Sequence, residues 1–254
     1  IQALFTGALP DAVREEALAA FAKLDTSDGV AVRSSATAED LPDLSFAGQQ
    51  DTFLNVRGEG ELLGALRNCW ASLWTERAMG YRHEAGVAKD AISMAVVVQE
   101  MVPSDVSGIL FTANPTTGER SEMIINASFG LGEAVVGGEI TPDTYLIDRP
   151  TLTVRDTTIG AKEHAIVPGR QGTDTKEVPA TERKRSSLTE DQIRELAVLA
   201  VEVENHYNGL PQDIEWAFAG DQLWLLQSRP ITSLPPAPLQ NVKWNLPADV
   251  PPWS

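Results

Sequence analysis

The sequence has little of several features that define whole classes of protein. Cys69 is the one cysteine among 254 residues, so no disulfide can form within the chain, and a reducing cytoplasm is the expected location. Because Cys69 lies in a helical pattern, we expect a buried structural thiol. No stretch approaches about eighteen consecutive apolar residues, which argues against a membrane span. Residues 1–10 lack the basic start and cleavage-type end of a signal peptide.

Positive charge is also scarce. The 20 lysines and arginines are outnumbered by 36 acidic residues, for a formal net charge of −16. Nucleic acid is therefore not an expected partner, since a phosphate backbone needs a basic footprint. Any anion site must be built locally from arginines, backbone N–H groups and a metal ion.

Periodic patterns along the chain predict an α+β fold. Helices are expected over 11–23, 61–83 and 189–207, the last opened by the capping box Thr189-Glu-Asp-Gln192. Residues 36–50 predict a loop, and 169–187 a mobile surface connection. Strands are expected over 29–35, 52–56, 92–102, 107–112, 121–128, 143–148, 151–155, 212–216 and 225–230. Locally paired strands among helices favour a mixed or antiparallel sheet with flanking helices over a doubly wound one.

The most polar pair of expected strands is the last hairpin, Gln212-Asp-Ile-Glu-Trp216 with Leu225-Leu-Gln-Ser-Arg-Pro230. Period-2 alternation sends Asp213 and Glu215 to one face, and Gln227 and Arg229 to one face of the returning strand. Carboxylates, an amide oxygen and a guanidinium on one face are suited to a hard cation and phosphate oxygens. The alternative is an ordinary solvated face of a hairpin.

Two earlier segments offer phosphate contacts. Arg33 ends an expected strand beside two serines, where its planar fork could hold phosphate oxygens, although a surface ion pair is the commoner role of such an arginine. In Ser45-Phe-Ala-Gly-Gln-Gln-Asp-Thr52, Gly48 allows the backbone to approach a ligand closely, and Thr52 adds a hydroxyl. A lone glycine in a polar loop is more often only a turn.

Three further segments carry candidate ligands. The apolar strand Val96-Val-Val-Gln-Glu-Met-Val102 leads into Gln99 and Met101, which could line a pocket for a flat base such as adenine; the alternative is a core strand reaching the surface. Thr112 ends another expected strand, where phosphate contact is again possible. Glu133 follows a glycine turn, a weak pattern by itself.

Taken together, these motifs resemble a known family. Val32–Pro42, Ser45–Asn55, Gly130–Glu133, Gln212–Glu215 and Gln227–Pro230 are similar to the ATP-binding domain of the phosphoenolpyruvate synthase and pyruvate phosphate dikinase family. Cys69–Arg77 and Ser107–Pro115 look most like the rifampin phosphotransferase branch. The resemblance runs from about Val30 to Thr232. It implies an ATP-grasp-like fold, in which two α+β lobes grip the nucleotide, with the N-terminal part of the lobe pair incomplete.

The resemblance also implies roles for residues of this chain. Arg33 and Arg229 would hold phosphates and act catalytically, with Gly48 and Thr52 in the phosphate-covering loop. Gln99 and Met101 would lie beside adenine. Glu215 and Gln227 would be ligands of Mg²⁺, which arrives with ATP and so offsets the negative charge of the chain. The transfer of roles is weaker for Thr112, Glu133 and Asp213.

Family members pass the β-phosphoryl group of ATP to a carrier histidine on a swivelling domain, releasing AMP and phosphate. The three histidines of this chain lack the family's carrier setting, so we expect the carrier on another domain and the acceptor, a rifamycin or pyruvate, on a further one. The family's opening glycine-and-lysine segment is not among these residues. We therefore expect residues 1–232 to be the ATP-binding domain, 233–254 to be a proline-rich linker, and this stretch alone to be inactive.

Two other functions are compatible with the sequence. One is a nucleotide-binding regulatory module without turnover. The other is an interaction domain with an acidic surface, which would not be stabilised by Mg-ATP.

Overall fold

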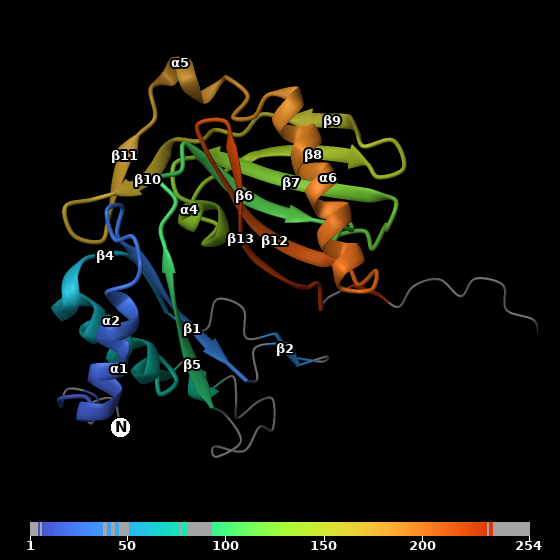
Figure 1. Ribbon diagram of the computed structural model, residues 1–254. Helices are drawn as coiled ribbons and strands as arrows, with labels where there is room; N and C mark the ends of the chain where they lie inside the picture. The colour runs from blue at the N-terminus through green and yellow to red at the C-terminus, as the bar shows by residue number, and fades with distance from the viewer. Residues whose placement is uncertain are drawn as a thin grey trace, which may run out of the picture.

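The computed structural model describes residues 5, 7–37, 40–41, 44–45, 51–76, 78–80, 93–232 and 234–235, and within these the chain forms two lobes (Figure 1). The strands of the smaller lobe are β1 (Val30–Ala36), β4 (Thr52–Val56) and β5 (Met94–Glu100), and its helices are α1 (Asp11–Phe21) and α2 (Gly58–Ser72). The strands form an antiparallel sheet in the order β4-β1-β5. A short hairpin of β2 (Asp40–Leu41) and β3 (Leu44–Ser45) lies in the segment predicted to be a loop.

Alternation along β1 explains how the smaller lobe is layered. Val30 and Val32 are fully buried and pack with the helices α1 and α2, in a cluster that includes Leu62 and Cys69. Ala31 and Arg33, one residue out of phase, point to the other face of the sheet, which lines the space between the lobes. The buried thiol predicted for Cys69 is confirmed.

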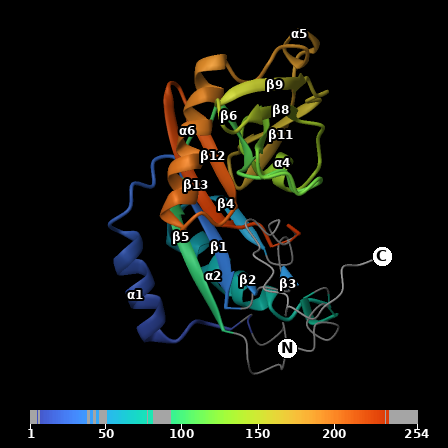
Figure 2. The same ribbon diagram turned by 90° about the vertical axis from the view of Figure 1, so that its right-hand side faces the viewer.

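The larger lobe is built on a six-stranded antiparallel sheet in the order β13-β12-β6-β7-β8-β9. Helix α6 (Glu190–His206) covers one face of this sheet (Figure 2). Apolar residues of α6 pack there against Leu110, Ile214 and Trp216. The strands are β6 (Val106–Phe111), β7 (Glu122–Phe129), β8 (Asp143–Asp148), β9 (Thr153–Thr158), β12 (Gln212–Ala219) and β13 (Gln222–Pro230).

The antiparallel α+β fold predicted from the sequence is confirmed, and it agrees with an ATP-grasp-like arrangement. The capping box is confirmed as well, because the Thr189 side chain accepts from Gln192 N–H and the Gln192 side chain accepts from Thr189 N–H. The helix predicted over 61–83 begins earlier and ends at Ser72. Helical structure begins again after Thr75, whose hydroxyl caps it by accepting a hydrogen bond from Ala78 N–H.

The segment 169–187, predicted to be a mobile surface connection, contains regular secondary structure that the prediction did not include. Residues of this segment form strand β11 (Thr173–Glu177), paired with β10 (His164–Pro168), and a short helix, α5 (Ala180–Arg183). Most of β11 is exposed, so its stability comes from backbone pairing to β10, and the sequence Thr-Asp-Thr-Lys-Glu carries no apolar alternation that would reveal it.

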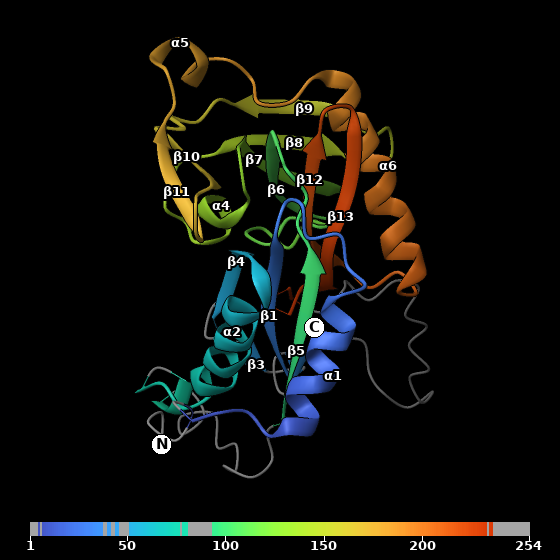
Figure 3. The ribbon, with the colours of Figure 1, turned by 60° about the vertical axis from the view of Figure 1, so that its left-hand side comes forward.

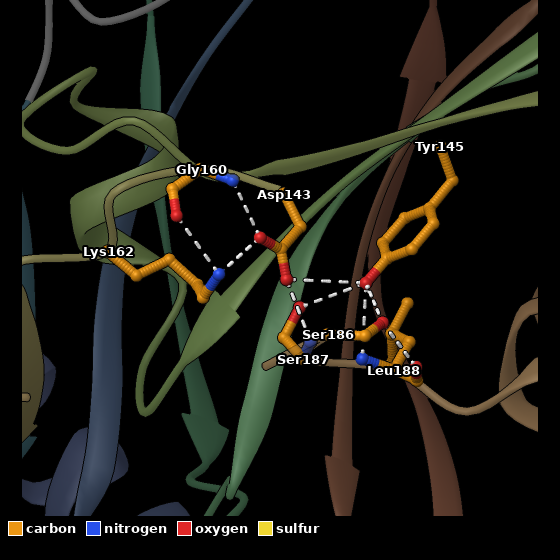
Figure 4. A network of polar contacts seen from close by, with 7 residues as sticks. All are labelled: Asp143, Tyr145, Gly160, Lys162, Ser186, Ser187 and Leu188. Carbon is orange, nitrogen blue, oxygen red and sulfur yellow. Dashed lines mark hydrogen bonds and ion pairs between the residues drawn. The ribbon is translucent and has the colours of Figure 1, made fainter. Parts of the chain in front are cut away.

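A buried polar network anchors the segment that leads into β10 (Figure 4). The carboxylate of Asp143 accepts hydrogen bonds from Gly160 N–H, Ser187 N–H and the Tyr145 hydroxyl, and pairs with the Lys162 ammonium. The side chains of Asp143 and Lys162 are both fully buried. One carboxylate thus ties β8, the approach to β10 and the approach to α6 together.

Among the described residues, no helix has the length and apolar character that a membrane crossing requires.

Candidate functional site

A cavity of about 670 Å³ lies between the two lobes. The small-lobe sheet forms one wall through β1, β4 and β5, and the β12–β13 hairpin and helix α4 (Glu133–Val136) form the other. The chain passes from β5 to β6 at this point, and Met101 and Val102 of that connection line the cavity.

The cavity brings together most of the residues predicted from the sequence. Those at its surface are Arg33, Thr52, Gln99, Met101, Glu133, Glu215, Gln227 and Arg229. They come from six separate segments spread over nearly two hundred residues, and no local pattern would collect them by itself.

The hairpin has the cross-strand arrangement that alternation predicts. Glu215 pairs with Gln227, and Asp213 with Arg229, in the register of β12 against β13. Arg229 donates from Nε to Asp213 Oδ2 at 2.9 Å, and its second guanidinium nitrogen lies 2.8 Å from the same oxygen. Burial raises the pKa of the Asp213 carboxyl, and the Arg229 charge opposes that rise. Asp213 therefore orients Arg229, whose side chain reaches the cavity.

Arg33 links the two walls. Its guanidinium donates to Glu215 Oε2 at 2.5 Å and to Gln227 Oε1 at 2.6 Å, across a sequence separation of more than 180 residues. The side chains of Arg33 and Glu215 are only 19% and 17% exposed, so this ion pair is largely shielded from water. The Nε atom of Arg33 is buried and has no hydrogen-bond partner.

The register of the small-lobe sheet separates the cavity into two ends. Arg33 lies opposite Thr52 of β4, whereas Ala31 lies opposite Gln99 of β5 and toward Met101. Two to three residues of strand, roughly 7–10 Å, separate these positions. The first end is polar, with the arginines and Glu215. The second is more apolar, with Leu54, Met101, Leu131 and Val136 among its lining residues.

The charge of the cavity wall is unusual for an anion site. Two arginines, Arg33 and Arg229, stand among five carboxylates, which are Asp51, Glu100, Glu133, Glu139 and Glu215. A polyanion brought in without a compensating cation would therefore meet net repulsion.

The structure does not bring Thr112 into this cavity. Thr112 is fully buried, and its hydroxyl accepts a hydrogen bond from Gln212 N–H at 2.8 Å. The reason is the period of the strand: Thr112 shares the core-facing side with Leu110, while Ile109 and Phe111 have the opposite parity. Its role is to hold the end of β6 to the start of β12.

Other predicted residues have different outcomes. Gly48 lies outside the described residues. Glu133 lines the cavity and accepts a hydrogen bond from the Thr173 hydroxyl at 3.2 Å. The expected adenine-side residue Gln99 donates to Leu226 O of β13 at 3.3 Å, so it is a second link between the lobes. His164 and His206 do not line the cavity, and His83 lies outside the described residues.

Sequence reasoning missed Asn55, at the end of β4. Its side chain is fully buried and donates to the turn between β10 and β11. An asparagine one residue before the end of a strand, followed by Arg57 and Gly58, was the available signal for a bend with a polar role.

Comparison with known proteins gives consistent results. Residues 1–248 match the family model described as pyruvate phosphate dikinase, AMP/ATP-binding domain. A phosphoenolpyruvate synthase of Pyrococcus furiosus is 45% identical over 240 residues, which cover 89% of this chain and 29% of that protein. A rifampicin phosphotransferase of a Streptomyces species is 49% identical over 232 residues, covering 91% of this chain and 26% of that protein. The chain thus spans less than a third of the length of these relatives.

Proposed function

The chain belongs to the family of pyruvate phosphate dikinase AMP/ATP-binding domains, and from this premise we propose that its interlobe cavity binds ATP with Mg²⁺. In the whole protein a carrier histidine on another domain would attack the β-phosphorus of ATP and displace AMP; water would then release the γ-phosphoryl group as phosphate and leave the β-phosphoryl group on the histidine. The observation that carries the proposal is the meeting of Arg33, Glu215, Gln227 and Arg229 at one end of one cavity.

The donor set fits a magnesium ion that arrives with phosphates. Glu215 and Gln227 offer one carboxylate and one amide oxygen, side by side in the hairpin register. Mg²⁺ is commonly held by one or two protein oxygens, with phosphate oxygens and water completing its shell. In that position it would neutralise charge on the phosphates and so favour attack on the β-phosphorus.

Under this proposal, Arg33 and the metal ion compete for the same side-chain oxygens. The Glu215 and Gln227 oxygens that would hold the metal now accept from the Arg33 guanidinium. With Mg-ATP bound, Glu215 and Gln227 would hold the metal, and Arg33 would donate to the phosphates in place of these two side chains. Asp213 would keep Arg229 aimed at the same phosphates throughout.

The apolar end suits the nucleobase. Leu54 and Met101 pack against the cluster that contains Leu131, and all three side chains line the cavity. They offer an apolar surface to a flat ring. The nucleotide would thus lie along β1, with phosphates at Arg33 and adenine near Gln99 and Met101.

We further propose that the final acceptor is a rifamycin or pyruvate. A rifampicin phosphotransferase is 49% identical to this chain and a probable phosphoenolpyruvate synthase is 47% identical. These two identities are too close to each other to favour one acceptor. Assaying the full-length protein with each acceptor, in the presence of Mg-ATP, would identify it.

The proposal is tested by Glu215→Gln in the full-length protein, which removes the charge but keeps the shape of the side chain. We expect phosphorylation of the carrier histidine to fall by about 100-fold or more. Glu139→Gln is the matched control, because Glu139 lines the same cavity but comes from the segment after α4 and not from the β12–β13 hairpin. Normal phosphorylation in Glu215→Gln would refute the metal site. Mg-ATP binding without any phosphorylation in the unaltered protein would instead favour a regulatory module.

A further inference from the structure

The β10–β11 hairpin is an arm of the larger lobe that reaches the smaller lobe (Figure 3). At its base, Leu131 N–H donates to Ile166 O at 2.8 Å, and the Asp143–Lys162 network holds the segment just before β10. At its tip, the turn 169–172 lies against the end of β4 and the start of α2. The arm therefore joins the lobes at a second place, separate from the Arg33 ion pair.

Asn55 makes the contact at the tip of the arm. Its Nδ2 donates to Gly169 O at 2.8 Å and to Gly172 O at 2.7 Å, so both amide hydrogens are used on the turn. Its Oδ1 accepts from Arg57 Nε at 2.8 Å, and Arg57 in turn donates to Ser27 O. The side chain is fully buried with its hydrogen-bonding groups engaged, which makes it a costly contact to lose.

The same residue contacts the apolar end of the cavity. The backbone N–H of Asn55 donates to Sδ of Met101, and the preceding residue, Leu54, lines the cavity beside Met101. Leu54 and Met101 pack against the cluster of Leu131 and Ile166, which belongs to the α4 region and the arm. The position of the arm and the width of the apolar end are thus coupled through one short stretch of β4.

We propose that Asn55 is a latch between the lobes, and that it positions the base-binding end of the cavity by holding the β10–β11 arm against β4. Asn55 is a positioning residue, since it does not line the cavity. The inference about nucleotide affinity rests on the proposed function; the inference about the arm does not. Loss of the latch should loosen the arm and weaken binding of the base, and should leave the polar end, roughly 7–10 Å along the strands, unaffected.

A simpler role for Asn55 must be separated from this one. Asn55 has a φ of 54°, in the left-handed region where asparagine is enriched among non-glycine residues. If the backbone were the whole reason for asparagine here, glycine would serve equally well, because it adopts this conformation without strain. Asn55→Gly therefore removes the latch and keeps the backbone.

The chain supplies a matched control. Asn208, just after α6, has a φ of 57° and is exposed, so Asn208→Gly makes the same chemical change at the same backbone conformation without touching the arm.

The experiment compares Asn55→Gly and Asn208→Gly in the full-length protein by hydrogen exchange and by ligand titration. We expect amide exchange in residues 164–177 to quicken at least tenfold in Asn55→Gly only. We expect the affinities for AMP and for Mg-ATP to fall by the same factor, about tenfold, while the affinity for Mg-tripolyphosphate stays unchanged. Unchanged exchange in residues 164–177 would overturn the latch, and equal weakening of all three ligands would overturn its assignment to the base end.

Two further outcomes are informative. If the unaltered protein binds no adenine nucleotide, the proposed function fails, and hydrogen exchange still decides the latch. If Asn55→Gly does not fold, Asn55→Asp takes its place, because an aspartate keeps the shape of the side chain but cannot donate to Gly169 O and Gly172 O. Faster exchange of residues 169–173 in that variant supports the latch, and unchanged exchange contradicts it.

Discussion

Replacing Lys162 with methionine should destabilise the protein strongly, because it leaves the charge of Asp143 buried and unpaired. Both side chains are fully buried, and the carboxylate would keep three neutral donors, from Gly160, Ser187 and Tyr145. Breaking a buried ion pair from one side costs about 3–5 kcal/mol. Lys162 has a φ of 40°, and methionine bears similar backbone strain there, so the difference reports on the charge.

The second half of this prediction is a double-mutant cycle with Asp143→Asn. The asparagine removes the uncompensated charge, so the double variant should be more stable than Lys162→Met alone, with a coupling energy of about 2 kcal/mol. Urea unfolding of the four proteins measures these free energies. Lys184→Met, at an exposed lysine, should change stability by less than about 0.5 kcal/mol.

Two results would contradict this reasoning. Should Lys162→Met lose less than about 1 kcal/mol, the pair is not an important part of the fold. If the double variant is no more stable than Lys162→Met, the loss has a cause other than the buried charge.

Two further predictions concern other parts of the fold. Burial, and secondarily the charge of Asp51, raises the pKa of the Cys69 thiol to about 12, so at pH 8 a disulfide reagent should label the native protein about a thousandfold more slowly than the urea-unfolded protein. Below pH 9 the Cys69 thiol is neutral in both the folded and the unfolded protein, and the contribution of the raised pKa to stability is fully present. As the pH rises from 9 toward 12, the thiol ionises first in the unfolded protein and this contribution is lost. The free energy of unfolding should therefore fall more steeply over that range in the unaltered protein than in Cys69→Ala. Equal labelling rates before and after unfolding would contradict the burial. Thr189→Ala removes the acceptor for Gln192 N–H and should cost about 1 kcal/mol in urea unfolding, whereas Thr189→Ser should cost less; equal losses would show that the cap is unimportant.

The sequence was a good guide wherever a local pattern carried the information. Alternation in the last hairpin predicted which side chains of Asp213, Glu215, Gln227 and Arg229 share a face, and the register of β12 and β13 agrees. Thr189 and Gln192 predicted the start of α6 because capping is decided within a single turn.

Prediction failed where long-range pairing decides the structure. Strand β11 has a mostly polar sequence and is formed by its pairing with β10, so the hydrophobic pattern alone predicted only a surface connection. Thr112 was placed at the phosphates because it ends a strand, although applying the alternation of Leu110 would have put it in the core. Asn55 was missed because its partners, Gly169 and Gly172, are more than a hundred residues away.

The sheet order of the larger lobe has a consequence for how the protein is made. Strand β6 pairs with β12, which follows it by about a hundred residues, so a ribosome exposes β6 long before its neighbour exists. During that interval Leu110 and the edge of β6 that pairs with β12 remain uncovered. Exposed apolar side chains and unpaired strand edges make a growing chain prone to misassembly. The hairpin with Glu215, Gln227 and Arg229 arrives last among these strands, so a nascent polypeptide gains the second wall of its cavity only when this sheet is finished.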